Sequence, residues 1–572
     1  MGHRAGSAGG GLSGSPYGAA MLRLTELKLP LEHAPGAVEA ALVARLGLRP
    51  GELLSCTVAR RAWDARKRSA IELVYTLDFS VRDEAALLRR HARDGVLART
   101  LGPAPDTTYR HVTQARTPLP KRPVVIGTGP CGIFAALILA EMGFRPIILE
   151  RGKVVRERTK DTWALWRRSQ LTTESNVQFG EGGAGTFSDG KLWSGIKDPQ
   201  HLGRKVLTEF VEAGAPEEIL WVAKPHIGTF RLVQMVESMR AKIEALGGEY
   251  RFGTKVTDFI VETGRDGLRR MRGVVTEAGE TIETDHVVLA IGHSSRDTFA
   301  TLLQRGVHVE PKPFSLGVRI EHPQSLIDRA RFGAFAGNRI LGAADYKLVH
   351  HCRGKGLEGR SVYSFCMCPG GTVVAATSED GRVVTNGMSQ YSRAERNANA
   401  GIVVGITPEV DFPGDPLAGV ALQRRWEDAA FIAGEGEYRA PAQRVGDFLA
   451  QRPSTQLGEV IPSYKPGVTP TDLSRCLPDF VVAAIREALP AFGRQIAGFD
   501  MADAVMTGVE TRTSSPVRIR RDASFRSVNT LGLYPAGEGA GYAGGIFSAG
   551  VDGIRVAEAV GRDMAGLEAA AA

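Results

Sequence analysis

Residues 123–150 read PVVIGTGPCGIFAALILAEMGFRPIILE, and this stretch decides the fold. The apolar run at 124–126 predicts a short buried strand of a parallel sheet. A glycine-rich turn at 127–132 follows it. The apolar segment 133–142 then predicts a helix, and Gly143 is placed to form its cap.

The turn has the pattern G-x-G-x-x-G, and each glycine has a physical reason. Gly127 permits the tight turn, Gly129 lets the main chain approach a pyrophosphate, and Gly132 lets helix and strand pack closely. The helix N-terminus offers free N–H groups to phosphate. A second apolar strand, 147–149, ends at Glu150, roughly 20 residues past the turn, where a carboxylate accepts hydrogen bonds from ribose hydroxyls. The sequence therefore predicts a site for FAD or NAD rather than NADP.

Length and composition indicate a soluble globular protein of two or three domains. The 572 residues are 43% hydrophobic and 23% charged, with a net charge of +8 that fits a phosphate-bearing ligand without requiring nucleic acid. Six irregularly spaced cysteines argue against a disulfide framework and favour a reducing, cytoplasmic compartment. No apolar run reaches the roughly 18 residues of a membrane span. Residues 1–20 lack the apolar core of a secretory signal and are expected to form a disordered tail.

Residues 21–116 are expected to form a ferredoxin-like α+β domain with the order β-α-β-β-α-β. The expected elements are strands at 22–29, 52–59, 71–79 and 109–112, and helices at 36–46 and 82–93. The turn between the two central strands is basic and contains Arg60, Arg61, Arg66, Lys67 and Arg68 beside Trp63. Such a turn can touch RNA, but a solvated turn or a docking surface is the expectation.

The expected fold class is α/β, with a Rossmann-type FAD-binding domain interrupted by a second domain. We place the first part of the FAD-binding domain at 117–304, an inserted β-rich α+β substrate domain at 305–500 and the C-terminal part at 501–572. An antiparallel excursion over 250–283 is expected to feed the apolar strand 286–292. In the inserted domain we expect strands at 315–320, 361–366, 372–376 and 382–385, and helices at 415–433, 443–451 and 479–489.

Two further glycine-rich stretches are candidates for cofactor contact. Residues 179–191, FGEGGAGTFSDGK, include Gly183 and Thr186 and can lie flat against a pyrophosphate or a flat ring. Residues 532–545, GLYPAGEGAGYAGG, predict a strand that ends in Glu538 and precedes a helix. No second Rossmann unit is expected here, because too little chain follows. Instead, we expect Glu538 to bond the ribityl chain of a flavin while the helix N-terminus stabilises negative charge on the reduced ring.

These stretches resemble the FAD-dependent oxidoreductases of the glutathione-reductase-like superfamily, and within it the bacterial family of uncharacterised FAD-dependent dehydrogenases. The matching segments are VVIGTGPCGIFAALILAEMGFRPIILERG, VQFGEGGAGTFSDGKL, YSFCMCPGG, TGVETRTSSPVRI and GLYPAGEGAGYAGGIFSAGVDG, with DARKR in the N-terminal part. The resemblance implies FAD contacts from Gly127, Gly129, Gly132, Glu150, Arg151, Gly183, Thr186, Gly292, Gly537 and Glu538. Position 538 is often Asp in the superfamily, and Glu can make the same bond.

Four residues are candidates for the chemistry, of which Arg319 is the weakest. Cys366-Met-Cys368 on a strand is expected to place both thiols on one face, where they can relay electrons, trap an electrophile or simply pack under a turn. Arg512 is placed to hold an anionic substrate or the flavin, or to form a surface ion pair, and Arg319 is a weaker candidate of the same kind. The segment HHC at 350–352 matches no zinc spacing, so no metal site is predicted.

The expected function is that of a FAD-dependent oxidoreductase, which moves electrons through flavin N5 to or from a small molecule. Only one dinucleotide fingerprint is present, so NAD(P)H, if it is the electron donor, would visit the active site transiently. Three alternatives stay open: a polyprenyl reductase at a membrane surface, suggested by YSFCMCPGG; an RNA-modifying flavoprotein, suggested by the basic turn; and a non-catalytic flavin-binding module. No stable nucleic-acid partner is expected, and the oligomeric state stays open.

Overall fold

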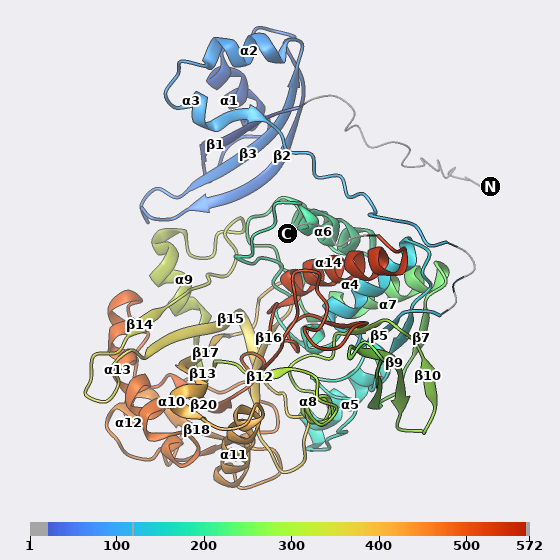
Figure 1. Cartoon of the computed structure of the whole chain (residues 1–572). Coiled ribbons are helices and arrows are strands. Elements are labelled where there is room, and N and C mark those ends of the chain that lie inside the picture. The colour runs from blue at the N-terminus through green and yellow to red at the C-terminus, as the bar shows by residue number, and fades with distance from the viewer. Residues whose placement is uncertain (1–20, 117–118, 120, 568–572) are drawn as a thin grey trace, which may run out of the picture. The chain divides into compact units, whose positions relative to one another are not determined.

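The computed structural model describes residues 21–116, 119 and 121–567 (Figure 1). The chain divides into two compact units. One contains the residues up to Asp106 together with Trp221–Ala223, and the other contains Thr107–Leu220 and the residues from Lys224 onward. Within the described part the strands form five sheets, and the fold is mixed α/β. No helix there combines the length and apolar composition that crossing a bilayer requires.

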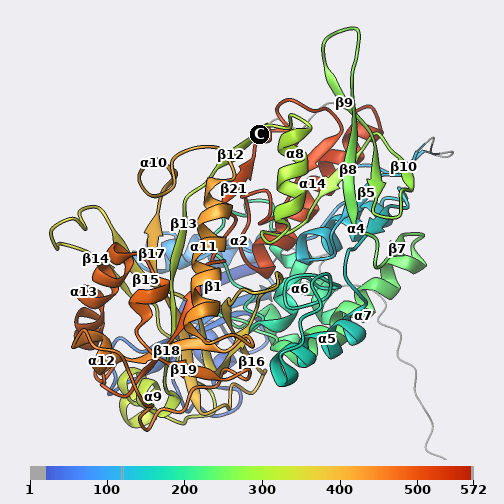
Figure 2. The same cartoon turned by 90° about the horizontal axis from the view of Figure 1, so that it is seen from below.

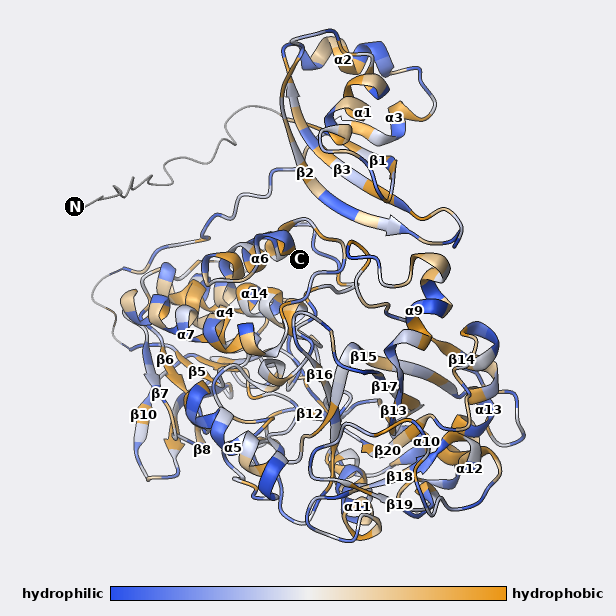
Figure 3. Cartoon of the chain, turned by 180° about the vertical axis from the view of Figure 1, so that it is seen from behind, coloured by the Kyte–Doolittle hydropathy of each residue, from blue (hydrophilic) through white to orange (hydrophobic). Residues whose placement is uncertain are grey.

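The first unit is an antiparallel sheet with the strand order β2-β3-β1-β4. Its elements are β1 (Leu22–Pro30), α1 (Ala37–Leu46), β2 (Leu53–Asp64), β3 (Glu72–Val81), α2 (Glu84–His91), α3 (Leu97–Thr100) and β4 (Leu101–Pro103). Every second residue of β3 is buried, as the alternating sequence predicts, and Figure 3 shows the hydropathy along this strand.

The prediction of a strand at 109–112 is wrong. The short β4 completes the sheet of the first unit, and residues 109–112 belong to the second unit, where they form no strand. The reason is a contact far along the chain: the half-buried Tyr109 donates a hydrogen bond to Glu558 at 3.0 Å.

The second unit is built on a parallel sheet with the order β22-β11-β5-β6-β7. The strands are β5 (Val124–Ile126), β6 (Ile147–Leu149), β7 (Glu249–Arg251), β11 (Val287–Leu289) and β22 (Leu533–Pro535). All residues of β5, β6, β11 and β22 are buried, as in a parallel sheet covered on both faces. The segment at 250–252 was expected in the antiparallel excursion, but β7 instead pairs with β6 in parallel.

The elements that accompany this sheet are α4 (Pro130–Glu141), α5 (Val155–Arg168), η1 (Ala184–Phe187), α6 (Leu202–Glu212), η2 (Glu217–Leu220), α7 (Thr229–Ala245), α8 (Arg296–Gln304) and α14 (Ile546–Met564). Helix α4 is buried from Cys131 to Ala140 and packs on α14 (Figure 1). The approach is close, because a Cβ on Gly553 would lie 2.3 Å from the carbonyl oxygen of Cys131. Gly143 follows α4 with a φ of +84°, which confirms the expected cap.

Two smaller sheets belong to the same unit. The expected antiparallel excursion is confirmed in β8 (Val256–Thr263), β9 (Arg269–Thr276) and β10 (Thr281–Glu283), which Figure 2 shows beside α8. The second is the pair β12 (Val309–Pro311) and β21 (Val517–Ile519).

The large sheet has the order β14-β15-β17-β13-β20-β18-β19, with β16 also paired to β15. Its strands are β13 (Phe314–Pro323), β14 (Val349–His351), β15 (Ser361–Ala375), β16 (Thr385–Ser389), β17 (Asn397–Ile406), β18 (Ala440–Arg444), β19 (Val468–Pro470) and β20 (Val505–Glu510). The nearby helices are α9 (Gln324–Phe332), η3 (Gly333–Phe335), α10 (Pro408–Asp411), α11 (Ala418–Ala433), α12 (Val445–Leu449), η4 (Leu473–Cys476) and α13 (Asp479–Gln495).

Three expectations for this region are corrected. The strands expected at 361–366 and 372–376 are one strand, β15. The helix expected at 415–433 begins only at Ala418, and the Asp415 carboxylate before it accepts from the Leu417 N–H at 2.7 Å. The sheet also continues past residue 500, since β20 pairs with β13.

Candidate active site

The expected cofactor residues meet at one edge of the parallel sheet. Gly127 follows β5, Glu150 follows β6, Gly292 lies just after β11 and Gly537 lies just after β22. These are the carboxyl ends of four parallel strands. Open α/β sheets bind ligands in the crevice at this edge, where the strand order reverses. Here the order reverses between β5 and β11.

Two glycines of the turn between β5 and α4 have no room for a side chain. A Cβ on Gly127, whose φ is +98°, would lie 2.3 Å from the carbonyl oxygen of Ala290, and one on Gly132 would lie 1.9 Å from the carbonyl oxygen of Gly127. The close helix–strand packing expected from these glycines is therefore present. The main chain of Gly183 lies close to that of Gly129. A Cβ added to Gly183 would be 2.7 Å from the Gly129 Cα. The pyrophosphate contacts of these two residues stay predictions.

Glu150 is buried, and both of its carboxylate oxygens accept hydrogen bonds from the chain. Oε2 accepts from the Thr128 N–H at 3.0 Å and from the Thr128 hydroxyl at 2.7 Å. Oε1 accepts from the N–H groups of Gly152 at 2.9 Å and Gly180 at 3.0 Å. Glu150 thus ties the glycine turn to the 179–191 loop. A ribose hydroxyl would share or replace one of these donors, so the ribose contact stays a prediction.

Two other residues that the resemblance implied are engaged with protein groups. Arg151 forms ion pairs with Glu174 at 2.6 Å and Asp297 at 2.9 Å. Thr186 is buried, and its carbonyl oxygen accepts from the Thr229 hydroxyl at 2.8 Å. Their contacts with FAD also stay predictions.

Arg158 of α5 is a site residue that the sequence argument missed. It is fully buried and donates to the carbonyl oxygens of Asn176 at 2.7 Å, Val177 at 2.8 Å and Glu181 at 2.7 Å, which holds the glycine loop in place. Burial lowers the pKa of this guanidinium to about 10, so it stays charged at neutral pH. Arg158 lies one turn after Val155 on the buried face of α5, but the sequence does not distinguish it from the other basic residues of this helix.

Glu538 lies at the same sheet edge, close to Lys312. Burial raises the pKa of its carboxyl to about 7, and the charge of Lys312 and the N–H of Gly545 offset part of this rise. The loop is fixed by Gly537, whose N–H donates to Asp552 at 2.8 Å. Lys312 also donates to the Ser514 hydroxyl at 3.3 Å, which links the Glu538 loop to the pocket described next.

A pocket of about 400 Å³ opens where β13, β15 and β17 come together. Six of its lining residues carry hydroxyls, three are aromatic and none is charged. The lining comprises Pro313, Phe314, Ser315, Gly359, Ser361, Tyr363, Phe365, Gly405, Ile406, Thr407, Thr513 and Ser514. The hydroxyls of Ser315 and Tyr363 are bonded to each other. Such a lining suits a small molecule with neutral polar groups.

The expectation that Cys366 and Cys368 present both thiols alike on one face is wrong. The register of β15 against β17 shifts between Phe365 and Cys368, and Cys366 has a φ of +44°. Cys366 is consequently exposed, whereas Cys368 is buried. A β-bulge of this kind breaks the two-residue alternation on which the expectation rested. The thiols are free, and their redox role stays a prediction.

Lys191, at the end of the glycine loop, is a second residue that the sequence argument missed. Its ammonium donates to the Met367 carbonyl oxygen and lies 3.4 Å from Asp189. Burial raises the pKa of the Cys368 thiol to about 11, and the charges of Lys191 and Arg319 offset part of this rise. Lys191 therefore connects the glycine loop to the cysteine bulge.

Arg512 belongs to a buried ion network rather than to the surface. Its guanidinium pairs with Glu427 at 3.1 Å and donates to the hydroxyls of Ser378 at 2.7 Å and Ser294 at 3.1 Å. Glu427 is fully buried and also pairs with Arg296 at 2.6 Å. With its donors engaged in this way, Arg512 is better suited to fixing β20 near the sheet edge than to holding an anion. Its catalytic role stays a prediction.

Arg319 has a comparable position inside the large sheet. It pairs with Glu510 at 2.8 Å and donates to the Cys366 carbonyl oxygen at 2.9 Å, so it supports the bulge.

Comparison with known proteins places the chain in a family. The model of the family described as "FAD-dependent protein, C-terminal domain-like" matches residues 313–513, and a domain of unknown function matches residues 21–80. An uncharacterised protein of Clostridium beijerinckii is 45% identical over 539 residues, which cover 94% of this chain and 98% of that protein. The chain belongs to this family of uncharacterised FAD-dependent proteins.

Solved structures resemble this FAD-dependent protein only weakly. L-amino acid deaminase from Proteus vulgaris is 13% identical over 81% of this chain and 98% of its own, with a TM-score of 0.35. CtdE, in complex with FAD and its substrate 4, is 12% identical over 78% of this chain and 82% of its own, with a TM-score of 0.31. Such values say nothing about the reaction of this FAD-dependent protein.

The sheet edge fits the FAD that the family implies. The glycine turn leads into the N-terminus of α4, where Gly129 and Gly132 present no side chain to a pyrophosphate. Gly292 has a φ of +72°, and a Cβ there would meet no atom within 4 Å, so the chain leaves space at the end of β11. Glu150 and Glu538 supply acceptors at the ends of two other strands.

Proposed function

We propose that this protein is an oxidoreductase that uses FAD to oxidise or reduce a small, uncharged molecule. The observation that carries the proposal is the convergence of Gly127, Glu150, Gly292 and Glu538 on one edge of a parallel sheet, with a hydroxyl-lined pocket linked to that edge through Lys312. Ligand sites of open α/β sheets lie at this edge, at the strand-order reversal.

Each part of the site has a separate task in this proposal. The glycine turn and Glu150 hold the dinucleotide, and Glu538 with Lys312 holds the flavin end. FAD, when bound, supplies hydride or electron transfer. The chain's own contribution is to position the substrate and exclude water.

The substrate would bind in the pocket beside Ser514. Because no charged residue lines the pocket, a charged substrate would lose its hydration without gaining a partner, which disfavours it. The bonded hydroxyls of Ser315 and Tyr363 can donate to or accept from a polar group of the substrate.

The proposal also includes an electron donor, a cellular compartment for the protein and the three kinds of domain. NAD(P)H would act as a transient electron donor, since one dinucleotide fingerprint is present. A reducing, cytoplasmic compartment is supported by six free cysteines. A ferredoxin-like domain, a Rossmann-type FAD domain and an inserted substrate domain are supported by the strand orders.

The alternatives receive less support. A polyprenyl reductase needs a long apolar tunnel, whereas half of the residues that line this pocket carry hydroxyls. The basic turn that suggested RNA is partly engaged, since Arg66 pairs with Asp64 and Arg61 stacks on Trp221.

The test combines a reductive titration with a pocket-filling variant. NADH, NADPH and a dithiol are added anaerobically to the flavin-loaded protein, and uncharged candidate substrates are screened for turnover. Gly405→Leu is the informative variant, because Gly405 lines the pocket and a Cβ there meets no atom within 4 Å. We expect unchanged FAD content with turnover lost or KM raised at least about tenfold. Unchanged kinetics in Gly405→Leu would place the substrate elsewhere. If no donor reduces the bound flavin, the protein is a binding module.

A further inference from the structure

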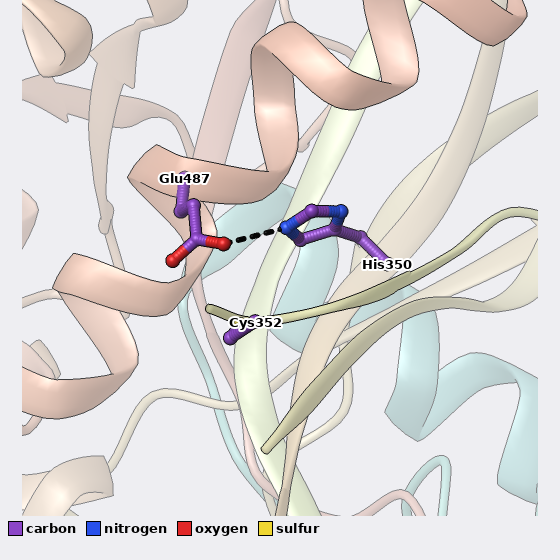
Figure 4. Close-up of side chains that lie close together, drawn as sticks. All are labelled: His350, Cys352 and Glu487. Atoms are coloured by element: carbon purple, nitrogen blue, oxygen red, sulfur yellow. Dashed lines mark hydrogen bonds and ion pairs between the residues drawn. The ribbon is translucent and has the colours of Figure 1, made fainter. Parts of the chain in front are cut away.

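His350, Cys352 and Glu487 bring three metal-binding atoms together, outside the site described above (Figure 4). His350 lies on the edge strand β14, Cys352 follows that strand, and Glu487 is on α13. The imidazole nitrogen, the thiol sulfur and a carboxylate oxygen all lie within 4.8 Å of one another. The His350 Nε2 and Glu487 Oε1 atoms are 2.8 Å apart.

We propose that these three side chains bind one zinc ion. Zinc takes imidazole nitrogen, thiolate sulfur and carboxylate oxygen at about 2.0–2.3 Å in a tetrahedral arrangement, which separates the ligand atoms by roughly 3.3–3.6 Å. A small movement of His350 away from Glu487 admits the ion. The mixture of one soft and two harder ligands favours zinc over magnesium or calcium, which bind oxygen. A thiolate and a carboxylate together balance the charge of the ion, and water fills the fourth position.

The surrounding main chain holds the ligands in position. Glu487 accepts from the N–H of Arg353 at 2.8 Å and from the N–H of Gly354 at 2.9 Å. The N–H of Cys352 donates to the carbonyl oxygen of Arg360 at 3.0 Å, which closes the connection between β14 and β15. Hydrogen bonds that orient the metal-binding side chains in this way are common in metal sites.

Hydrogen bonding accounts for the positions of His350 and Glu487 in the cluster, but it does not account for the position of the Cys352 thiol. The contacts of Glu487 with His350 and two N–H groups would also serve a loop without metal. Cys352, however, is buried and forms no disulfide, and its sulfur lies within 4.8 Å of the other two ligand atoms. Burial raises the pKa of this thiol, and a coordinated zinc ion reverses that effect because the metal binds the thiolate.

The ion would also support the pocket. The connection that starts at Cys352 ends at Gly359 and Ser361, both of which line the pocket. By joining β14 to α13, zinc would fix one end of this connection. The metal site itself does not depend on the FAD assignment, because it uses none of the same residues.

The test measures zinc directly on the full-length protein. After removal of metal with a chelator, zinc is titrated in competition with a chromophoric chelator. Cobalt provides a second signal, because a thiolate-bound tetrahedral cobalt ion absorbs to the red of a flavin. We expect one ion per chain, and at least about tenfold weaker binding in Cys352→Ser, His350→Gln and Glu487→Gln.

The matched control is His351→Gln. His351 is the next residue of β14, but its Nδ1 bonds the Ser361 hydroxyl at 2.8 Å and it is not part of the cluster. This variant should bind zinc like the wild type. The proposal is overturned if the wild type binds no stoichiometric zinc, or if Cys352→Ser and His350→Gln bind it as tightly as His351→Gln. Three separate ligand variants keep the test decisive if one of them fails to fold.

Discussion

Glu150 binds Thr128 twice, through the backbone N–H at 3.0 Å and through the hydroxyl at 2.7 Å. Glu150→Gln replaces one acceptor oxygen by an NH₂ group that cannot accept, so buried donors lose their partner. We expect the free energy of unfolding to fall by about 1–3 kcal/mol, together with weaker FAD binding. Chemical denaturation and flavin titration measure both effects. The exposed Glu358→Gln is the control, and equal stability of the two variants would contradict the role of Glu150.

Gly132→Ala is expected to open the glycine turn. The added Cβ would lie 1.9 Å from the carbonyl oxygen of Gly127, so strand and helix must separate. We predict loss of bound FAD and a lower Tm. Gly195→Ala is the control, because a Cβ at Gly195 meets no atom within 4 Å. Wild-type FAD content in Gly132→Ala would show that the turn does not set the cofactor site.

Glu427→Gln is expected to be strongly destabilising. Glu427 is fully buried between Arg296 and Arg512, and its neutralisation leaves these two buried guanidinium groups with Glu379 alone, which pairs with Arg296 at 2.7 Å. The expected loss is about 3–5 kcal/mol of unfolding free energy, measured by chemical denaturation. Glu262→Gln breaks an exposed pair with Arg272 and should cost less than about 1 kcal/mol. Similar losses in the two variants would argue against the buried network.

The two cysteines of the bulge should react at different rates. Cys366 is exposed, whereas Cys368 is buried and its thiol has a pKa raised to about 11. Alkylation near neutral pH, read by peptide mass spectrometry, should therefore label Cys366 well before Cys368. Equal labelling of both thiols in the folded protein would contradict the bulge. A disulfide between them on mild oxidation would support the redox role.

Glu538 should make stability depend on pH. Because burial raises the pKa of its carboxyl from the usual range of about 4.3 to about 7, the folded chain holds this proton more tightly than the unfolded chain. The stabilising contribution is present below about pH 4.3 and is lost as the pH rises through about 7. The Tm of the wild type relative to Glu538→Gln should therefore fall between about pH 5 and 8. A constant difference would show that Glu538 titrates normally.

The sequence predicts the parallel sheet well, because its signals are local. The runs at 124–126 and 147–149 and the glycines between them determine strand, turn and helix within 30 residues of chain. The strand at 109–112 was wrong because Tyr109 is held by Glu558, more than 400 residues away. The cysteine bulge was missed for a related reason: Arg319 on β13 bonds the Cys366 carbonyl oxygen, and no pattern near the cysteines reveals this.

The sequence predicts the glycines and carboxylates of the candidate site better than its basic residues. Glycines and carboxylates at strand ends follow known spacings, so the places of Gly127 and Glu150 after two parallel strands were predicted from sequence, while their contacts with FAD stay predictions. Lys191, Lys312 and Arg158 were not predicted as site residues, because single basic residues are common on surfaces. Only the packing of distant segments buries Arg158 and half-buries the two lysines.

The most direct test of the central claim is the flavin content of the purified full-length protein. Its absorbance spectrum is recorded before and after addition of FAD, and the bound flavin is released and quantified. We predict one non-covalently bound FAD per chain, with binding lost in Gly132→Ala. A protein that shows no flavin absorbance and binds no FAD when it is supplied would contradict the account.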